Sequence, residues 1–378
     1  MRVLIDYRAA LRERTGVGEY THQLARALLA AACAPTGRPL DLTIFSSSAR
    51  DRLRADADLA GAHLVDRQIP VRLLNLAWHR MGWPPAEMLA GGAFDVAHSL
   101  HPLLLPTRSA AQVVTIHDLN FLLHPERTRA EVRRDYPALA RDHAHRADRV
   151  IVVSHFTASE VQRLLELPPD RISVCPPGGP PWTARSTQPK DGYVLFFGTL
   201  EPRKNLGALL DAYEMLAGRR ANLPRLVLAG KATEQSAPWL ERLGRAPLKN
   251  LVTHLGYVDP AKREALYAGA RLLVQPSFEE GFGLPVLEAM TAGVPVVAAN
   301  AGALPEVGGN AVLLASPTDP SSFASAIERL LDDDQCVETS VTAGIARAAS
   351  FSWAHTARTT LDAYEQAMTR RTATRGAA

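Results

Sequence analysis

The sequence predicts an α/β protein made of two doubly wound domains, each with a parallel sheet. Short runs of β-branched and aliphatic residues alternate with longer Ala-, Leu- and Arg-rich segments of helical period, which is the pattern of repeated βαβ units. The same rhythm stands on both sides of a proline- and glycine-rich stretch. The length of 378 residues supplies enough chain for two substantial cores, at about 150 residues per domain.

The hydrophobic runs place strands in both halves of the chain. In the first half, the predicted strands are Arg2–Ile5, Leu42–Phe45, Val96–His98, Val113–Ile116 and Arg149–Val153. In the second half, they are Tyr193–Phe197, Arg225–Ala229, Val252–Leu255, Leu272–Gln275, Pro295–Ala298 and Ala311–Leu314. Open α/β sheets bind ligands beyond the carboxyl ends of their strands. We therefore expect the functional residues in the loops that follow these runs.

A Pro/Gly-rich stretch at 176–181, followed by the polar segment 185–192, cannot continue a helix or a central strand. We therefore expect an N-terminal domain over residues 1–185 and a C-terminal domain over residues 186–352. Residues 353–371 have helical period and are expected to form a helix that packs back on the N-terminal domain. The tail from Thr372 has little to pack, and we expect it to be disordered.

The composition excludes several classes of protein. Lys and Arg number 42 and Asp and Glu 39, a surplus too small to drive sequence-independent nucleic-acid binding. The cysteines Cys33, Cys175 and Cys336 lie far apart, which argues against a disulfide framework or a zinc cluster. The start has no signal-peptide pattern, and no stretch approaches the roughly 20 apolar residues of a membrane span. We expect a cytoplasmic protein.

The most informative motif is PSFEEGFGLPVLEAM at residues 276–290, directly after a predicted strand. Its glycines, Gly281 and Gly283, allow the backbone to approach a ligand closely. A helix with proline in its first turn would then offer free amides to a phosphate.

Two glutamates, Glu280 and Glu288, flank this predicted phosphate site. Carboxylates accept hydrogen bonds from vicinal hydroxyls, so the motif indicates a ribose, a diphosphate and a sugar. The alternative makes Glu280 a solvated loop charge and Glu288 a partner of the helix dipole.

Three further motifs follow predicted strands. In GTLEPRKN at residues 198–205, the adjacent cations Arg203 and Lys204 suit a diphosphate leaving group. His117 ends a hydrophobic strand, where a histidine is either structural or functional. The glycines Gly16 and Gly18, between the first strand and a helix, do not form a dinucleotide fingerprint.

The segment PSFEEGFGLPVLEAMTAGVPVVAANAGALPEV resembles the E-x7-E element of retaining glycosyltransferases of the GT-B fold, family GT4, with Glu280 and Glu288 as its glutamates. The resemblance covers nearly the whole chain and is most specific from Tyr193 to Leu314. It implies two facing Rossmann-like domains with an interdomain cleft, and transfer of a sugar from a nucleotide diphosphate sugar with retained anomeric configuration.

The resemblance also implies roles for individual residues. Glu288 would hold the ribose and Glu280 would meet the donor sugar, while His117 would contact that sugar and the developing transition state. Many relatives carry an arginine directly after the glycine at position 198, where this chain has Thr199. We therefore assign the diphosphate to Arg203 and Lys204.

These assignments give two groups of site residues. The predicted catalytic residues are His117, Glu280, Arg203 and Lys204. The predicted donor-binding residues are Gly16, Gly18, Gly198, Arg203, Lys204, Glu280, Gly281, Phe282, Gly283, Leu284 and Glu288. No metal and no cofactor beyond the nucleotide sugar is expected, because the cations and the helix end can neutralise the diphosphate.

The expected activity is that of a hexosyltransferase, mannosyltransferase-like, in polysaccharide or glycolipid assembly, with a glycan or lipid-linked sugar as acceptor. GDP-mannose is the favoured donor, and UDP-sugars stay open. The alternatives on the same scaffold are a nucleotide-sugar epimerase, a glycan phosphorylase and a non-catalytic subunit that binds sugar nucleotides. Residues 67–85 mix arginines with Leu, Met and Trp, which is typical of contact with the inner face of the membrane or of core packing.

Overall fold

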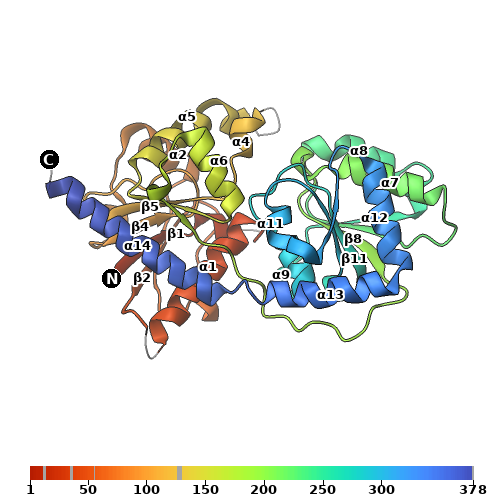
Figure 1. The fold of residues 1–378 in the computed structure, drawn as a ribbon. Helices are drawn as coiled ribbons and strands as arrows, with labels where there is room; N and C mark the ends of the chain where they lie inside the picture. The colour runs from red at the N-terminus through yellow and green to blue at the C-terminus, as the bar shows by residue number, and fades with distance from the viewer. Residues whose placement is uncertain (12–13, 35–36, 55, 126–129, 377–378) are drawn as a thin grey trace. The chain divides into compact units, whose positions relative to one another are not determined.

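The computed structural model describes residues 1–11, 14–34, 37–54, 56–125 and 130–376, with the side chains of 130–135 outside the description. The chain forms two compact units (Figure 1). Unit 1 comprises Met1–Gly178 and Ser352–Ala378, and unit 2 comprises Gly179–Phe351. Residues 179–185, which the sequence prediction placed in the first domain, thus belong to unit 2. Each unit carries one parallel sheet, so the predicted fold class is confirmed.

Unit 1 is built on a seven-stranded parallel sheet in the order β3-β2-β1-β4-β5-β6-β7. Its strands are β1 Arg2–Asp6, β2 Asp41–Ser47, β3 His63–Arg67, β4 Val96–Ser99, β5 Ala111–Ile116, β6 Arg149–Val152 and β7 Ile172–Val174. The five predicted strands are all present. The two additional strands, β3 and β7, are the edges of the sheet, and they lack a long apolar run because an edge strand is only partly buried.

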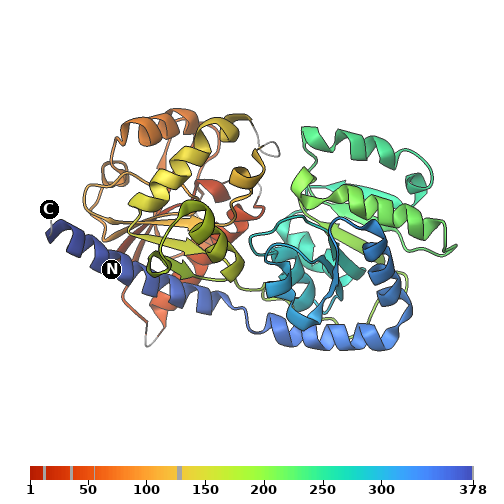
Figure 2. The same cartoon turned by 45° about the horizontal axis from the view of Figure 1, so that its top comes forward.

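The helices of unit 1 cover both faces of this sheet. They are α1 Val17–Cys33, α2 Val71–Leu76, α3 Ala86–Ala90, α4 Asn120–Leu123, α5 Ala130–Arg146, α6 His155–Leu165 and α14 Trp353–Gly376. Side chains alternate across a strand, so Ala97 joins a core with Trp78 while its neighbour His98 bonds to α14. Figure 2 shows α14 in dark blue and α5 in yellow on opposite faces of the sheet.

The final helix belongs to unit 1 although it follows unit 2 in the sequence. The Tyr364 hydroxyl lies 2.7 Å from Nδ1 of the buried His98, and the Thr356 hydroxyl donates to the carbonyl of Pro176 (2.6 Å). The helix continues to Gly376, so the expectation of a disordered tail from Thr372 is wrong over these residues. The guanidinium of Arg375 donates to the carbonyl of Arg108, which holds the last turn.

Unit 2 contains a six-stranded parallel sheet in the order β10-β9-β8-β11-β12-β13. The strands are β8 Tyr193–Phe197, β9 Leu226–Ala229, β10 Val252–Gly256, β11 Ala270–Gln275, β12 Val296–Ala299 and β13 Leu313–Ala315. All six lie within a few residues of their predicted positions. The strand order reverses between the neighbours β8 and β11, and such a switch point is where an open α/β sheet binds its ligand.

The helices of unit 2 follow its strands in turn. They are α7 Leu206–Ala217, α8 Ala237–Leu243, α9 Pro260–Ala268, α10 Leu284–Thr291, α11 Leu304–Gly308, α12 Pro320–Asp332 and α13 Asp334–Ala348. Across the described part of the chain, each helix is too short or too polar to cross a bilayer.

Candidate functional site

Two loops lie side by side at the switch point of unit 2. One follows β8 and contains the short turn Pro202–Lys204, and the other runs from Pro276 to Gly283 after β11. The backbone N–H of Phe278 donates to the carbonyl of Arg203 (2.9 Å), and Asn205 Nδ2 donates to the carbonyl of Pro276 (3.0 Å). These bonds fix the cations of the first loop beside the carboxylates of the second.

Glycines shape the second loop. Gly283 has a φ of +104° and leads directly into α10, which carries proline in its first turn as predicted. Gly302, with a φ of +60°, lies against the loop from the other side. A Cβ atom on Gly302 would stand 2.7 Å from the backbone nitrogen of Glu280, so a larger residue would displace the loop.

The carboxylate of Glu280 is the centre of the site. Its Oε1 atom accepts hydrogen bonds from Lys204 Nζ (2.6 Å), Ser277 Oγ (2.7 Å) and Gln275 Nε2 (2.8 Å). Its Oε2 atom accepts from Arg203 at 3.2 Å. The residue is 5% exposed. Burial by itself would raise the pKa of Glu280, but the nearby charges of Lys204 and Arg203 outweigh it and lower the pKa to about 2.

Three of the four predicted catalytic residues therefore form one cluster, Glu280 with Arg203 and Lys204. Lys204 is buried, and Arg203 is about a quarter exposed and also pairs with Glu201 (2.6 Å). Burying these charged groups costs desolvation free energy, which their mutual attraction and hydrogen bonds must offset. The cluster sets two fixed cations at a strand end, where a developing negative charge would be stabilised.

Glu288 lies on α10 and has partners that the sequence prediction missed. The hydroxyl of Tyr267 donates to its Oε2 atom (2.6 Å), and Arg263 lies 3.8 Å from Oε1. Arg263 and Tyr267 stand four residues apart on α9, so they share one face of that helix. That spacing is also typical of core packing, so the two partners of Glu288 could not be recognised from the sequence.

The remaining predicted residues of unit 2 lie in the two loops or at the start of α10. Gly198 directly follows β8 and donates to the carbonyl of Ala229 (2.9 Å), while Gly281 is buried within the second loop. The ring of Phe282 packs edge-on against Phe351 at 5.5 Å, so its visible role is in the core. Leu284 is the first residue of α10.

In unit 1, His117 follows the last residue of β5. Burial lowers the pKa of His117 to about 4, so the imidazole is neutral near pH 7. Its Nε2 atom lies 3.1 Å from the carbonyl of Leu100. A carbonyl only accepts, so Nε2 carries the proton and Nδ1 is left as an acceptor. The ring packs edge-on against Tyr20 at 4.8 Å.

The two glycines of unit 1 have internal roles. Gly16 precedes α1 with a φ of +42°, and Gly18 is buried against the turn at Arg8–Ala10. A Cβ atom on Gly18 would lie 2.6 Å from the carbonyl oxygen of Ala9. Close approach of the chain to itself therefore explains this glycine before any ligand is considered.

A polar cluster at the ends of β1 and β4 was not predicted. Asp6 is buried and pairs with Arg8 (2.7 Å) and with His101 (3.3 Å), and Arg8 also donates to Asn75 (2.8 Å). Burial would raise the pKa of Asp6, but the charge of Arg8 outweighs it and holds the pKa well below the ordinary range. The sequence feature that could have indicated this cluster is Asp6, an acidic residue at the end of a hydrophobic strand.

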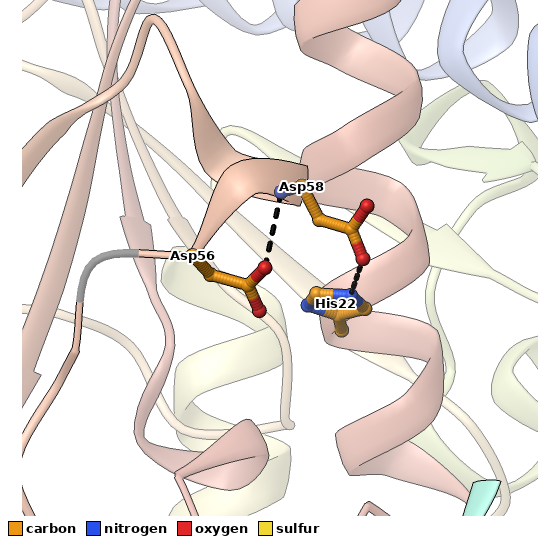
Figure 3. Close-up of side chains that lie close together, drawn as sticks. All are labelled: His22, Asp56 and Asp58. Carbon is orange, nitrogen blue, oxygen red and sulfur yellow. Dashed lines mark hydrogen bonds and ion pairs between the residues drawn. The ribbon is translucent and has the colours of Figure 1, made fainter. Parts of the chain in front are cut away.

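One group of possible metal ligands stands out among the described residues: His22, Asp56 and Asp58, whose ligand atoms lie within 4.8 Å of one another. Figure 3 shows Asp58 bonded to His22 Nε2 at 3.3 Å and Asp56 accepting from the Asp58 backbone at 3.0 Å. Arg14 pairs with Asp56 (3.1 Å) and Arg26 with Asp58 (3.4 Å). These contacts explain the group as a tether between α1 and the turn that contains Asp58.

The chain is similar to known proteins along most of its length. Residues 191–333 match a family model described as glycosyl transferases group 1, and residues 14–179 match one described as glycosyltransferase family 4. O-antigen chain mannosyltransferase B of Escherichia coli is 36% identical over 274 residues, which are 69% of this chain and 72% of that protein.

Two further comparisons extend the similarity. D-inositol 3-phosphate glycosyltransferase of Acidothermus cellulolyticus is 30% identical, covering 94% of this chain and 86% of that protein. Among solved structures, sucrose-phosphate synthase from Thermosynechococcus elongatus superposes with a TM-score of 0.75 at 21% identity, covering 97% of this chain and 98% of that one. At 21% identity, this similarity shows a shared fold and is no evidence of a shared activity.

Replacing Glu280 by Gln should destabilise the protein in a pH-dependent way. At neutral pH, the variant leaves Lys204 and Arg203 without their buried counter-charge, a loss of about 3–5 kcal/mol for a broken buried pair. The folded pKa of about 2 lies below the ordinary value of 4.5, so the carboxylate stabilises the fold fully above pH 4.5 and less as the pH falls toward 2. Thermal denaturation between pH 7 and pH 3 should show a gap to wild type that narrows in acid.

The exposed Glu338 of unit 2 supplies the matched control, because Glu338→Gln removes the same charge from a solvated helix surface. Its melting temperature should follow wild type at every pH. A Glu280→Gln gap that stays constant from pH 7 to pH 3, or that equals the control, would show that the carboxylate is not stabilised by the two cations.

Proposed function

The chain belongs to glycosyltransferase family 4, and we propose that within it the protein is a retaining mannosyltransferase that uses GDP-mannose. Its place among the glycosyltransferases of polysaccharide biosynthesis follows from the family and from the O-antigen relative. The choice of mannose is supported by that relative's activity, and GDP-mannose is the nucleotide form of this sugar. The acceptor is a glycan or a lipid-linked sugar.

The observation that carries the proposal is the cluster of Glu280, Arg203 and Lys204 at the switch point of unit 2. In the proposed complex, Lys204 and Arg203 stabilise the diphosphate as the bond to the sugar breaks. The first turn of α10 adds backbone amides, and Glu288 accepts hydrogen bonds from the ribose hydroxyls. Glu280 both positions the two cations and faces the donor sugar.

Retention is proposed to follow a front-face route. The group at the end of β5 is the neutral imidazole of His117, whose Nδ1 atom accepts hydrogen bonds. Together with its backbone carbonyl, this atom stabilises an oxocarbenium-like sugar through dipoles. The departing phosphate takes the proton of the attacking acceptor hydroxyl on the same face, so configuration is kept without a covalent intermediate.

Residues of the segment 71–83 provide a proposed contact with a membrane surface. Leu73, Leu76, Met81 and Trp83 are between 54% and 69% exposed, and the neighbouring arginines Arg72 and Arg80 are exposed as well. An apolar surface with basic residues beside it is typical of binding to anionic lipids. Trp78 is instead buried and packs on Phe45, as the core-packing alternative expected.

Vesicle co-sedimentation tests the membrane contact. The chain should sediment with vesicles that contain anionic phosphatidylglycerol more than with pure phosphatidylcholine vesicles. The double variant Leu73→Ser with Leu76→Ser should reduce this binding without lowering the melting temperature, because both side chains are exposed. Equal sedimentation of wild type and variant would exclude this segment as the contact.

Glu288→Ala should weaken binding of GDP by about tenfold or more, because the ribose loses a charged hydrogen-bond acceptor worth about 1.5–3 kcal/mol. Isothermal titration with GDP measures the change, and Glu338→Ala is the exposed control. Wild-type affinity in Glu288→Ala would remove this residue from the donor site.

Repeating the wild-type titration and the transfer assay with EDTA in place of magnesium checks the proposed metal independence. Activity lost in EDTA and restored by magnesium or manganese would contradict it.

His117→Ala should lower kcat by about 100-fold while leaving the affinity for GDP near that of wild type, because its interaction arises mainly in the transition state. Proton NMR of the product from GDP-α-mannose should show an α-linked sugar. An inverted anomer, or normal turnover in the variant, would overturn this mechanism. Isomerised donor without transfer would indicate an epimerase instead.

A further inference from the structure

Unit 1 contains a cavity of about 660 Å³ at the carboxyl ends of β1 and β2. Its walls come from the connection between β1 and α1 and from the loop that follows β2. The volume lies in the ordinary range of small-molecule sites. No step of the proposed donor chemistry uses this cavity.

The lining is strongly basic. Four arginines, Arg14, Arg50, Arg52 and Arg54, face two carboxylates, Asp51 and Asp56, among the residues that line it. Two of the arginines are already engaged, Arg14 with Asp56 at 3.1 Å and Arg52 with Asp66 at 2.7 Å.

The other two arginines keep their charge available. Arg50 and Arg54 are exposed and form no ion pair with any residue that the structure describes. Arg50 and Arg54 stand on either side of Arg52 in the loop that follows β2, and all three line the cavity. The cavity therefore holds two guanidinium groups that no described carboxylate neutralises.

Other residues that line the cavity, Tyr7 and Leu59, are held in place by the buried core of unit 1. The hydroxyl of Tyr7 lies 2.7 Å from Nδ1 of His22, and Nε2 of His22 bonds to Asp58 in the turn that ends at the buried Leu59 (Figure 3). Burial raises the pKa of Tyr7 to about 12, so its hydroxyl stays protonated. Apolar and hydroxyl groups thus line the cavity together with the arginines.

We propose that this cavity binds an anionic group, a phosphate or a carboxylate, carried by the sugar acceptor. Arginine is the side chain best suited to such groups, because its planar fork donates two parallel hydrogen bonds to them. This inference rests on the proposed function, because it specifies that the glycan or lipid-linked sugar that accepts the transferred sugar carries a negative charge.

The position in the sheet agrees with an acceptor site. The strand order runs β2-β1-β4-β5, so Arg50 and Arg54 after β2 and His117 after β5 follow strands that are three spacings apart along one edge of the sheet. Three spacings are about 14 Å. A sugar anchored by its anionic group in the cavity can therefore extend along this edge toward His117.

The test compares charged and neutral sugars on the full chain, with GDP present to occupy the donor site. Mannose 6-phosphate, glucuronic acid, mannose and glucose are titrated by NMR. Wild type should bind one of the charged sugars better than its neutral counterpart, and which one it binds distinguishes phosphate from carboxylate. The double variant Arg50→Ala with Arg54→Ala should lose this preference, by about tenfold or more.

A matched control removes two exposed arginines elsewhere in unit 1, Arg2→Ala with Arg146→Ala. It should bind the charged sugars like wild type. If both double variants bind them equally, or if wild type shows no preference for charge, the anion site is overturned. Affinity for GDP is measured in the same samples: failure of wild type to bind GDP contradicts the proposed function, whereas normal GDP binding without a charge preference contradicts the anion site alone.

Discussion

A single buried carboxylate organises the site of unit 2. Glu280 neutralises Lys204 and Arg203 and keeps these cations at the point where the strand order reverses. Charges this well buried need partners, so the loops after β8 and β11 must fit closely. The hydrogen bond from the Phe278 backbone N–H to the Arg203 carbonyl joins the two loops. Gly302 has no side chain and so leaves room for the second loop. In the proposed complex, the donor diphosphate meets cations that the fold has already positioned.

Much of this arrangement could be predicted because it is local in sequence. The inner strands of unit 2, such as β9, β11 and β12, are buried on both faces and appear as apolar runs. The motif from Pro276 to Met290 contains its glycines, proline and glutamates within one loop and one helix. The sheet topology brings the two loops together, because β8 and β11 are neighbouring strands. Glu280 therefore contacts Lys204, although more than 70 residues of chain separate them. Hydrophobic periodicity alone does not reveal such a contact.

What could not be predicted depends on tertiary neighbours. In the sequence, Arg263 and Tyr267 have the spacing of an ordinary helix face. Only the folded structure shows that both contact Glu288. The arginines at 50, 52 and 54 belong to no motif, and they line a cavity only because β2 pairs with β1. The sequence also did not reveal that the carbonyl of Ala9 excludes a side chain at Gly18, whose predicted contact with the donor stays a prediction.

Lys204, held by Glu280, is proposed to bind the diphosphate of the donor. Isothermal titration of wild type and Lys204→Ala with GDP and with guanosine tests this role. The variant should lose most of the affinity that the diphosphate adds, while guanosine binds to both proteins alike. Equal losses for GDP and guanosine would mean that Lys204 supports the fold and not the ligand, and would contradict the proposed role.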